Sequence, residues 1–283
     1  MIKILSDSSS LYSKKQALAN NLDISSLAVT INNKTYIEYE EIQTPAFIAL
    51  IHEGHIPTSS QPSIGDVLDL YNTYPDDELI NISMADGLSG TYQSACMAKE
   101  MASNPDRIHV INSQTLCGPQ QYLVDLAVAL AQEGKSSEEI ISEIQHAIKH
   151  TKSYLIPHDF DYLVRGGRLS PLVGKIGGLI KLVPVTTLSE DGKSLDKFAV
   201  ARSFKKAIGK ICEAMQGDGV DSNCKIYIAH ALKEDLAQEA KTIISDFIKD
   251  ADIEIKVLGP AFTTQGGPGC VAIQWIKKHE LLK

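Results

Sequence analysis

The chain has 283 residues, of which 43% are hydrophobic and 22% charged, and its formal net charge is -8. This length is typical of about two domains, and the acidic balance argues against a nucleic-acid partner, whose phosphates require a basic surface. The sequence has no apolar run near the roughly 18 residues of a membrane helix and no signal-peptide pattern at its start, so we expect a cytoplasmic protein. Five cysteines without a C-x-x-C pair predict free thiols rather than disulfides or zinc.

The first half of the chain alternates strand patterns with helix patterns. Strands are predicted at 2–5, 27–31, 34–37, 79–83 and 108–111, with a hairpin through Asn32 and Asn33. Helices are predicted at 13–20, from 44, from 62, and at 94–101, 119–132 and 137–150. Strands separated by helices favour parallel pairing, so we expect a layered α/β fold in this half.

The second half has a different order of elements. It is predicted to contain a helix at 158–164, a hairpin of 182–188 with 193–201, a helix at 203–215, a strand at 225–229, a helix at 234–249, a strand at 253–258 and a final helix at 270–278. The glycines within the apolar segment 172–180 serve either close backbone packing or an apolar wall lining a tunnel. We place the boundary near 150–154, which gives domains 1–152 and 153–283.

Three clusters of hydroxyl residues lie where strands are expected to lead into helices. They are Ser6 to Ser10, Thr58 to Ser63, and Ser89 to Thr91. Ser, Thr and Asp are the usual caps of helix amides, so ordinary capping explains each cluster singly. Together they also predict donors that converge on an anionic head group, because ligands of parallel sheets bind beyond the carboxyl ends of the strands.

The sequence contains no recognisable set of catalytic residues. Phosphate-loop and dinucleotide fingerprints are absent, and in Gly87-Leu88-Ser89-Gly90 the second glycine comes one residue too early for a nucleophile elbow. His52 and His55 lack the spacing of a zinc helix. Asp159 is interpreted as a helix cap and His230 as a strand-end histidine, although both could take part in acid–base chemistry. We therefore expect no catalytic residue, metal or cofactor.

The motifs taken together resemble the DegV family, the fatty-acid-binding subunits of bacterial fatty acid kinase, over essentially the whole chain. They occur in the family's order: Ser6-Asp7-Ser8, Ser59-Ser60-Gln61-Pro62-Ser63, Leu88-Ser89-Gly90-Thr91-Tyr92, Arg165-Gly166-Gly167-Arg168-Leu169 and Gly267-Pro268-Gly269. The resemblance implies a two-domain α/β fold that buries one acyl chain between its domains. It also implies a non-catalytic protein that presents the fatty acid carboxyl group to an ATP-dependent kinase subunit, which makes acyl phosphate for phospholipid synthesis.

The resemblance assigns roles to individual residues, with Ser59 and Ser89 holding the carboxylate. The implied ligand site consists of Thr58, Ser59, Ser60, Ser89, Gly90, Thr91, Gln265 and Gly267, and the implied kinase contacts are Arg168 and Arg202. Two positions depart from the family pattern: Ser59 replaces the usual threonine, and Gln265 replaces the usual histidine. Glutamine can donate a hydrogen bond but cannot carry a positive charge, so the second departure bears on transfer to a kinase more than on binding.

Two other classes of function stay open at the level of the sequence. One is a binding or regulatory protein for another anionic amphiphile, without transfer to a kinase. The other is a small-molecule hydrolase or transferase that uses Ser89 or His230, which requires turnover by the chain alone.

Overall fold

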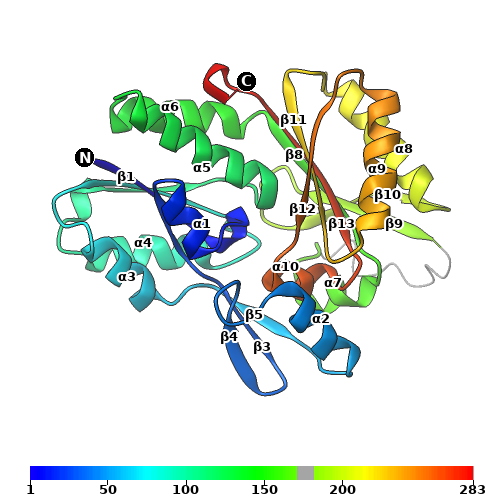
Figure 1. Cartoon of the computed structure of the whole chain (residues 1–283), viewed down its shortest axis with the longest axis horizontal. Coiled ribbons are helices and arrows are strands. Elements are labelled where there is room, and N and C mark those ends of the chain that lie inside the picture. Colours follow the sequence, from blue (N-terminus) through cyan, green and yellow to red (C-terminus); the bar gives the residue numbers. More distant parts are fainter. Residues whose placement is uncertain (171–181, 283) are drawn as a thin grey trace.

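The computed structural model describes residues 1–170 and 182–282, which form two layered units side by side (Figure 1). The first unit is built on a parallel sheet in the order β2-β1-β6-β7. Its strands are β1 (Ile2–Asp7), β2 (Leu22–Ser25), β6 (Glu78–Ser83) and β7 (Ile108–Asn112). The parallel pairing expected for the first half is confirmed, although β2 was not predicted.

Helices cover both faces of this parallel sheet (Figure 1). They are α3 (Ile64–Asn72) and α4 (Thr91–Met101) on one face, and α5 (Cys117–Gln132) and α6 (Ser137–Ile148) on the other. The short α1 (Lys14–Ala19) precedes β2, and three 3₁₀ turns lie at Ser8–Ser10, Pro105–Arg107 and Glu280–Leu282. A strand buried by helices on both faces needs apolar residues on both sides, as in Leu79 and Ile80 of β6.

A small antiparallel sheet, in the order β4-β3-β5, lies below the parallel sheet and packs against α2 (Thr44–His52). Its strands are β3 (Ala28–Ile31), β4 (Lys34–Ile37) and β5 (Thr58–Ser60). The predicted hairpin is confirmed, and both Asn32 and Asn33 have the positive φ that its tight turn requires. The second hydroxyl cluster is itself the strand β5, and only Ser63 caps a helix, α3, as expected.

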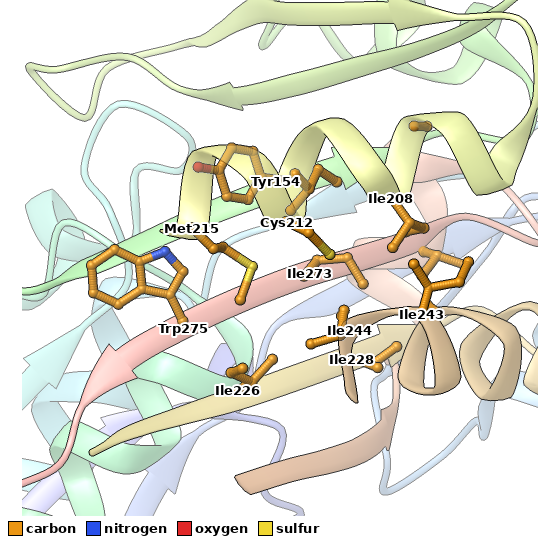
Figure 2. Packing of buried hydrophobic residues seen from close by; sticks show 14 of the residues in the cluster. Tyr154, Ile208, Cys212, Met215, Ile226, Ile228, Ile243, Ile244, Ile273 and Trp275 are labelled. Atoms are coloured by element: carbon orange, nitrogen blue, oxygen red, sulfur yellow. The ribbon is translucent and has the colours of Figure 1, made fainter. Parts of the chain in front are cut away.

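The second unit is a mixed six-stranded sheet in the order β10-β9-β8-β13-β11-β12. Its strands are β8 (Thr151–Ile156), β9 (Val183–Leu188), β10 (Leu195–Ala201), β11 (Cys224–His230), β12 (Asp252–Val257) and β13 (Val271–Lys277). Its outer face is covered by α8 (Phe204–Gly217) and α9 (Glu234–Phe247), as Figure 1 shows. Figure 2 shows the core between these two helices and the sheet, where Ile208 and Cys212 of α8 face Ile273 of β13.

The final helix predicted at 270–278 is wrong, because this segment forms the central strand β13. It pairs with both β8 and β11 in antiparallel register. Val271 to Ile276 are all buried, since both faces of a central strand are covered. A strand that is apolar on both faces lacks the alternation of a half-exposed strand, so periodicity does not distinguish it from a buried helix.

Two short helices, α7 (Phe160–Gly166) and α10 (Pro260–Gly266), lie at the junction of the two units. α10 contacts α7, α2, β3 and β5, and α5 contacts strands of both large sheets. Within the described residues, all strands from β8 onward belong to the six-stranded sheet. The boundary near 150–154 stays a prediction. The glycine-rich segment 172–180, predicted to pack closely or to line a tunnel, lies entirely outside the described residues.

Candidate functional site

An apolar cavity lies between the two units, where β8, β13 and α10 face the loops after β6 and β7. The cavity has a volume of about 100 Å³. Its apolar lining includes Met84, Leu88, Leu116, Leu155, Leu163, Leu188, Leu195, Leu258, Phe262 and Ala272. Cys117 and Cys270 also line it, and burial raises the pKa of both thiols. Such a lining suits an alkyl chain.

A polar cavity adjoins the apolar one at Arg168 and Gln265, which line both. This polar cavity has a volume of about 280 Å³. The rest of its lining comes from β5, α7, α10 and neighbouring turns: Ile56, Pro57, Thr58, Ser59, Tyr162, Arg165, Gly166 and Thr264. An apolar cavity and a polar cavity that share two side chains match the two ends of an amphiphile.

The contact between Ser59 and Gln265 lies at this junction. Gln265 Nε2 donates a hydrogen bond to Ser59 Oγ at 3.0 Å, across 206 residues of sequence. The register of β5 with β3 fixes Ser59 opposite Val29, whereas Gln265 is carried by α10. Gln265 Oε1 is buried without a partner among the described residues. Because Ser59 accepts from Gln265, its own O–H can donate to an oxygen of a ligand.

The third hydroxyl cluster has a visible structural role at the start of α4. Ser89 Oγ accepts a hydrogen bond from the Thr91 backbone N–H at 3.3 Å and lies 2.8 Å from Thr91 Oγ1. A β-carbon on Gly90 would lie 2.6 Å from the amide of Gln61, so the turn after β5 packs tightly against this helix start. Within the described ranges, the linings of the two cavities include Leu88 but not Ser89, Gly90 or Thr91.

The first hydroxyl cluster is buried and engaged in its own network. Asp7 accepts hydrogen bonds from the backbone N–H groups of Ser9 and Met84, and Ser9 donates to Gln120 at 2.6 Å. Burial raises the pKa of Asp7, despite these hydrogen bonds that lower it. A network built around a buried carboxyl group is unsuited to an anion, so the structure does not bring all three clusters to one head group.

Glu38 is a buried residue near the site that sequence reasoning missed. It is 0% exposed and accepts hydrogen bonds from Ser8 Oγ at 2.5 Å and from the Ala261 N–H at 3.0 Å. Burial raises its pKa to about 7. The second bond ties the loop after β4 to the start of α10, the helix that carries Gln265. A single Glu in a polar stretch gave no signal of this burial.

The remaining predicted site residues lie in different surroundings. Arg168 is half-buried, and its Nε donates to the Leu88 carbonyl at 3.0 Å, so it belongs to the walls of the two cavities. Arg202 is exposed at the end of β10. Gly267 ends α10 with a φ of 79°, and a β-carbon there would lie 2.8 Å from the Tyr162 ring. Thr58 and Ser60 are exposed on either side of Ser59.

Local contacts occupy the two acid–base candidates, Asp159 and His230. Asp159 caps α7 by accepting from the Asp161 N–H at 2.9 Å, which confirms the capping interpretation. His230 Nδ1 accepts from the Lys233 N–H at 2.9 Å at the end of its strand. Across residues 1–170 and 182–282, no cluster of three His, Cys, Asp or Glu side chains could hold a metal. Helices in the same ranges are too short or too polar to cross a membrane.

Comparison with known proteins identifies the family. The profile described as "Uncharacterised protein, DegV family" matches residues 1–278. This chain belongs to the DegV family. A DegV domain-containing protein of Staphylococcus aureus is 30% identical over 278 residues, which covers 97% of this chain and 98% of the relative. Protein DegV of Bacillus subtilis is 30% identical over 282 residues, which covers 98% and 99% of the two chains.

Solved structures of DegV proteins share the fold. DegV of Bacillus subtilis, described as a fatty acid binding protein, superposes with a TM-score of 0.86 at 29% identity and covers 98% of this chain and 99% of its own. A fatty acid binding DegV family protein of Streptococcus agalactiae superposes with a TM-score of 0.89 at 25% identity and covers 99% of both chains. The DegV fold expected from the sequence is confirmed.

Proposed function

We propose that this protein binds one long-chain fatty acid. The acyl chain occupies the apolar cavity, and the carboxyl group lies in the polar cavity beside Ser59 and Gln265. The observation that carries the proposal is that Gln265 and Arg168 line both the apolar and the polar cavity. The fatty acid binding described for the relatives of Bacillus subtilis and Streptococcus agalactiae supports it.

The energetics of burial permit this function. A sixteen-carbon acid buries about 14 methylenes at about 0.8 kcal/mol each, or roughly 11 kcal/mol before costs. Immobilising the ligand costs several kcal/mol, which leaves a dissociation constant in the micromolar to nanomolar range. An unpaired buried carboxylate costs several kcal/mol more. Charge-assisted hydrogen bonds, at about 1.5–3 kcal/mol each, offset that cost, and the Ser59 hydroxyl is placed to supply one.

Gln265 can serve either state of the head group. With Nε2 on Ser59, Oε1 has no partner in the described part of the chain and can accept a hydrogen bond from a protonated acid. A half-turn of the amide exchanges the two atoms, so that Nε2 donates to a carboxylate while Oε1 accepts from the Ser59 hydroxyl. The remaining head-group candidates, Thr58, Ser60, Ser89, Gly90, Thr91 and Gly267, stay predictions. Arg168 is a stronger candidate, because its guanidinium lies at the junction of the cavities.

We further propose that the protein is not an enzyme by itself and presents the acid to an ATP-dependent kinase in the cytoplasm, where ATP is available. The polar cavity is bordered by the exposed residues Thr58 and Arg165, which gives a partner a route to the carboxyl group. Arg168 and Arg202 stay predicted kinase contacts. A variant Gln265→His should bind the acid at least as tightly and be phosphorylated faster by a kinase that recognises the protein. Unchanged transfer would show that the histidine is not the missing element.

The alternative of an amphiphile-binding regulator without transfer is favoured by the same Gln265, which cannot carry charge or shuttle a proton. Mass spectrometry of natively purified protein, denatured in organic solvent, identifies the bound molecule. A stoichiometric long-chain fatty acid supports the proposed ligand. An empty protein that also takes up no added palmitate or oleate would refute it.

Substitution then locates the head group. Ser59→Ala should weaken palmitate binding about 10- to 100-fold, because one charge-assisted hydrogen bond is lost. Ser142→Ala is the control, since Ser142 is exposed on α6 and lines neither cavity. Equal affinities for both variants would remove Ser59 from the site.

A further inference from the structure

Gln274 is a polar side chain in the wall of the apolar cavity. Cys270, just before β13, and Ala272 and Gln274 within this strand alternate along the chain and all line the cavity. At about 3.3 Å per residue, the four steps from Cys270 to Gln274 span about 13 Å. Gln265, which also lines the polar cavity, lies on α10 before Cys270. Gln274 is therefore the cavity-lining residue that lies farthest along β13 from α10.

The amide group of Gln274 is held by three hydrogen bonds. Nε2 donates to the Leu116 carbonyl at 2.9 Å and to Ser153 Oγ at 2.8 Å, and Oε1 accepts from the Gly118 N–H at 3.3 Å. The residue is 1% exposed. Exchange of the two ends of the amide would place Oε1 against the Leu116 carbonyl oxygen, so the amide has one orientation. Both of its N–H donors are used, and it offers the cavity no free donor.

The surroundings of Gln274 leave the side chain little room to move. It pairs with Ser153 of β8 and with Tyr227 of β11, so it lies in the middle of the six-stranded sheet. A β-carbon on Gly118 would lie 2.2 Å from the Tyr227 ring, so the start of α5 packs directly on β11 beside it. Gln274 is thus fixed between its own sheet and α5, a helix that covers the first sheet.

An alkyl chain can lie against this amide at little cost. The polar atoms of the amide already have partners, so contact with methylene groups breaks no hydrogen bond. A chain that displaced the amide would separate it from Leu116, Ser153 and Gly118. The cost of leaving buried polar groups without partners exceeds what one further buried methylene gains. The amide therefore stops an alkyl chain instead of giving way to it.

We propose that Gln274 is the end wall of the acyl site and sets the longest fatty acid that the protein accommodates. This inference rests on the proposed function, because it requires the carboxyl group at Gln265 and the chain directed along β13. Each methylene that the cavity buries raises the affinity about fourfold. When the terminal methyl group reaches the amide, further methylenes no longer add to the affinity. The ligands are thus fatty acids up to a fixed chain length.

The experiment measures which acids the protein selects from a mixture. The delipidated full chain is equilibrated with equal amounts of laurate, myristate, palmitate, stearate and arachidate, and the bound acids are released and quantified by mass spectrometry. The natural chain should prefer one chain length. Gln274→Ala removes the end wall and should move this preference to an acid about two carbons longer, with a shift of about 4- to 16-fold in the ratio of the two acids.

Gln274→Met is the matched control. Both variants lose the hydrogen bonds to Leu116, Ser153 and Gly118, but methionine keeps the length of the side chain and therefore the wall. The methionine variant should keep the preference of the natural chain. If Gln274 only ties the two units together, both variants change all acids alike. A preference that is unchanged in Gln274→Ala, or that moves equally in both variants, contradicts the inference and leaves the proposed function standing. If the natural chain takes up none of the five acids, the proposed function fails as well.

A second position decides the question if Gln274→Ala does not fold. Ala272 lies two residues nearer to α10 on the same face of β13, and its pairing partner Leu155 also lines the cavity. Ala272→Leu leaves the contacts of Gln274 in place and fills the cavity before its end, so the preference should move to a shorter acid. A preference equal to that of the natural chain would mean that the acyl chain does not run towards Gln274, and the inference would be wrong.

Discussion

Replacing Glu38 by glutamine should remove a pH-dependent part of the protein's stability. The carboxyl group is fully buried, and burial raises its pKa from 4.5 to about 7. The titratable groups around it are Asp7, Tyr39 and Cys117. The charge of Asp7 also raises the pKa of Glu38. Among residues 1–170 and 182–282, no lysine or arginine contributes to the shift of the Glu38 pKa.

The direction follows from proton binding. Near pH 6 the folded protein holds a proton on Glu38 that the unfolded chain releases, so folding is favoured most below pH 4.5 and this contribution is lost as pH rises through 7. At about 1.4 kcal/mol per pKa unit, the loss between pH 5 and pH 8 is about 2 to 3 kcal/mol. A glutamine keeps an acceptor for the Ala261 N–H and does not ionise.

Urea unfolding at pH 5 and pH 8 measures this effect. The difference in unfolding free energy between Glu38→Gln and the natural chain should shift by about 2 to 3 kcal/mol in favour of the variant on going to pH 8. Glu133→Gln, at an exposed position at the end of α5, is the control and should show no such shift. A Glu38→Gln difference that does not change with pH would refute the reasoning.

Two further predictions concern the cavity and the contact between units. Bound palmitate should protect Cys117 and Cys270, which line the apolar cavity, from alkylation while partly exposed Cys96 reacts unchanged; equal protection of all three would argue against an acyl chain there. Gly118→Ala should lower stability by about 1–3 kcal/mol, because its β-carbon would lie 2.2 Å from the Tyr227 ring, whereas Gly209→Ala, with open space around it, should be neutral or stabilising in the same thermal melt.

The sequence was sufficient where short-range chemistry decides the structure. The hairpin at Asn32 and Asn33 follows from residues that tolerate positive φ, and Ser63 and Asp159 cap helices as their side chains predict. Helix and strand alternation determined the parallel sheet of the first unit, because parallel neighbours need a crossover between them. The order of the five motifs along the chain indicated the DegV family.

Tertiary structure decided which residues meet. Ser59 and Gln265 are 206 residues apart, and only the packing of α10 on β5 joins them. Composition does not distinguish the first hydroxyl cluster from the second. Only the structure shows that the first is buried against Gln120 and that the second lines a cavity. The sequence around Glu38 is typical of a surface residue, but the folded chain buries it and bonds it to the Ala261 N–H.

The strand β13 shows the same limit in the backbone. Its residues are compatible with a buried helix or a central strand, and its pairing with β8 and β11 selects the strand. The sequence by itself determined the local turns, the caps, the parallel half of the fold and the family. The tertiary structure decided the central strand, the buried carboxyl groups and the residues that line the cavities, because burial and hydrogen-bond partners depend on segments distant in the chain.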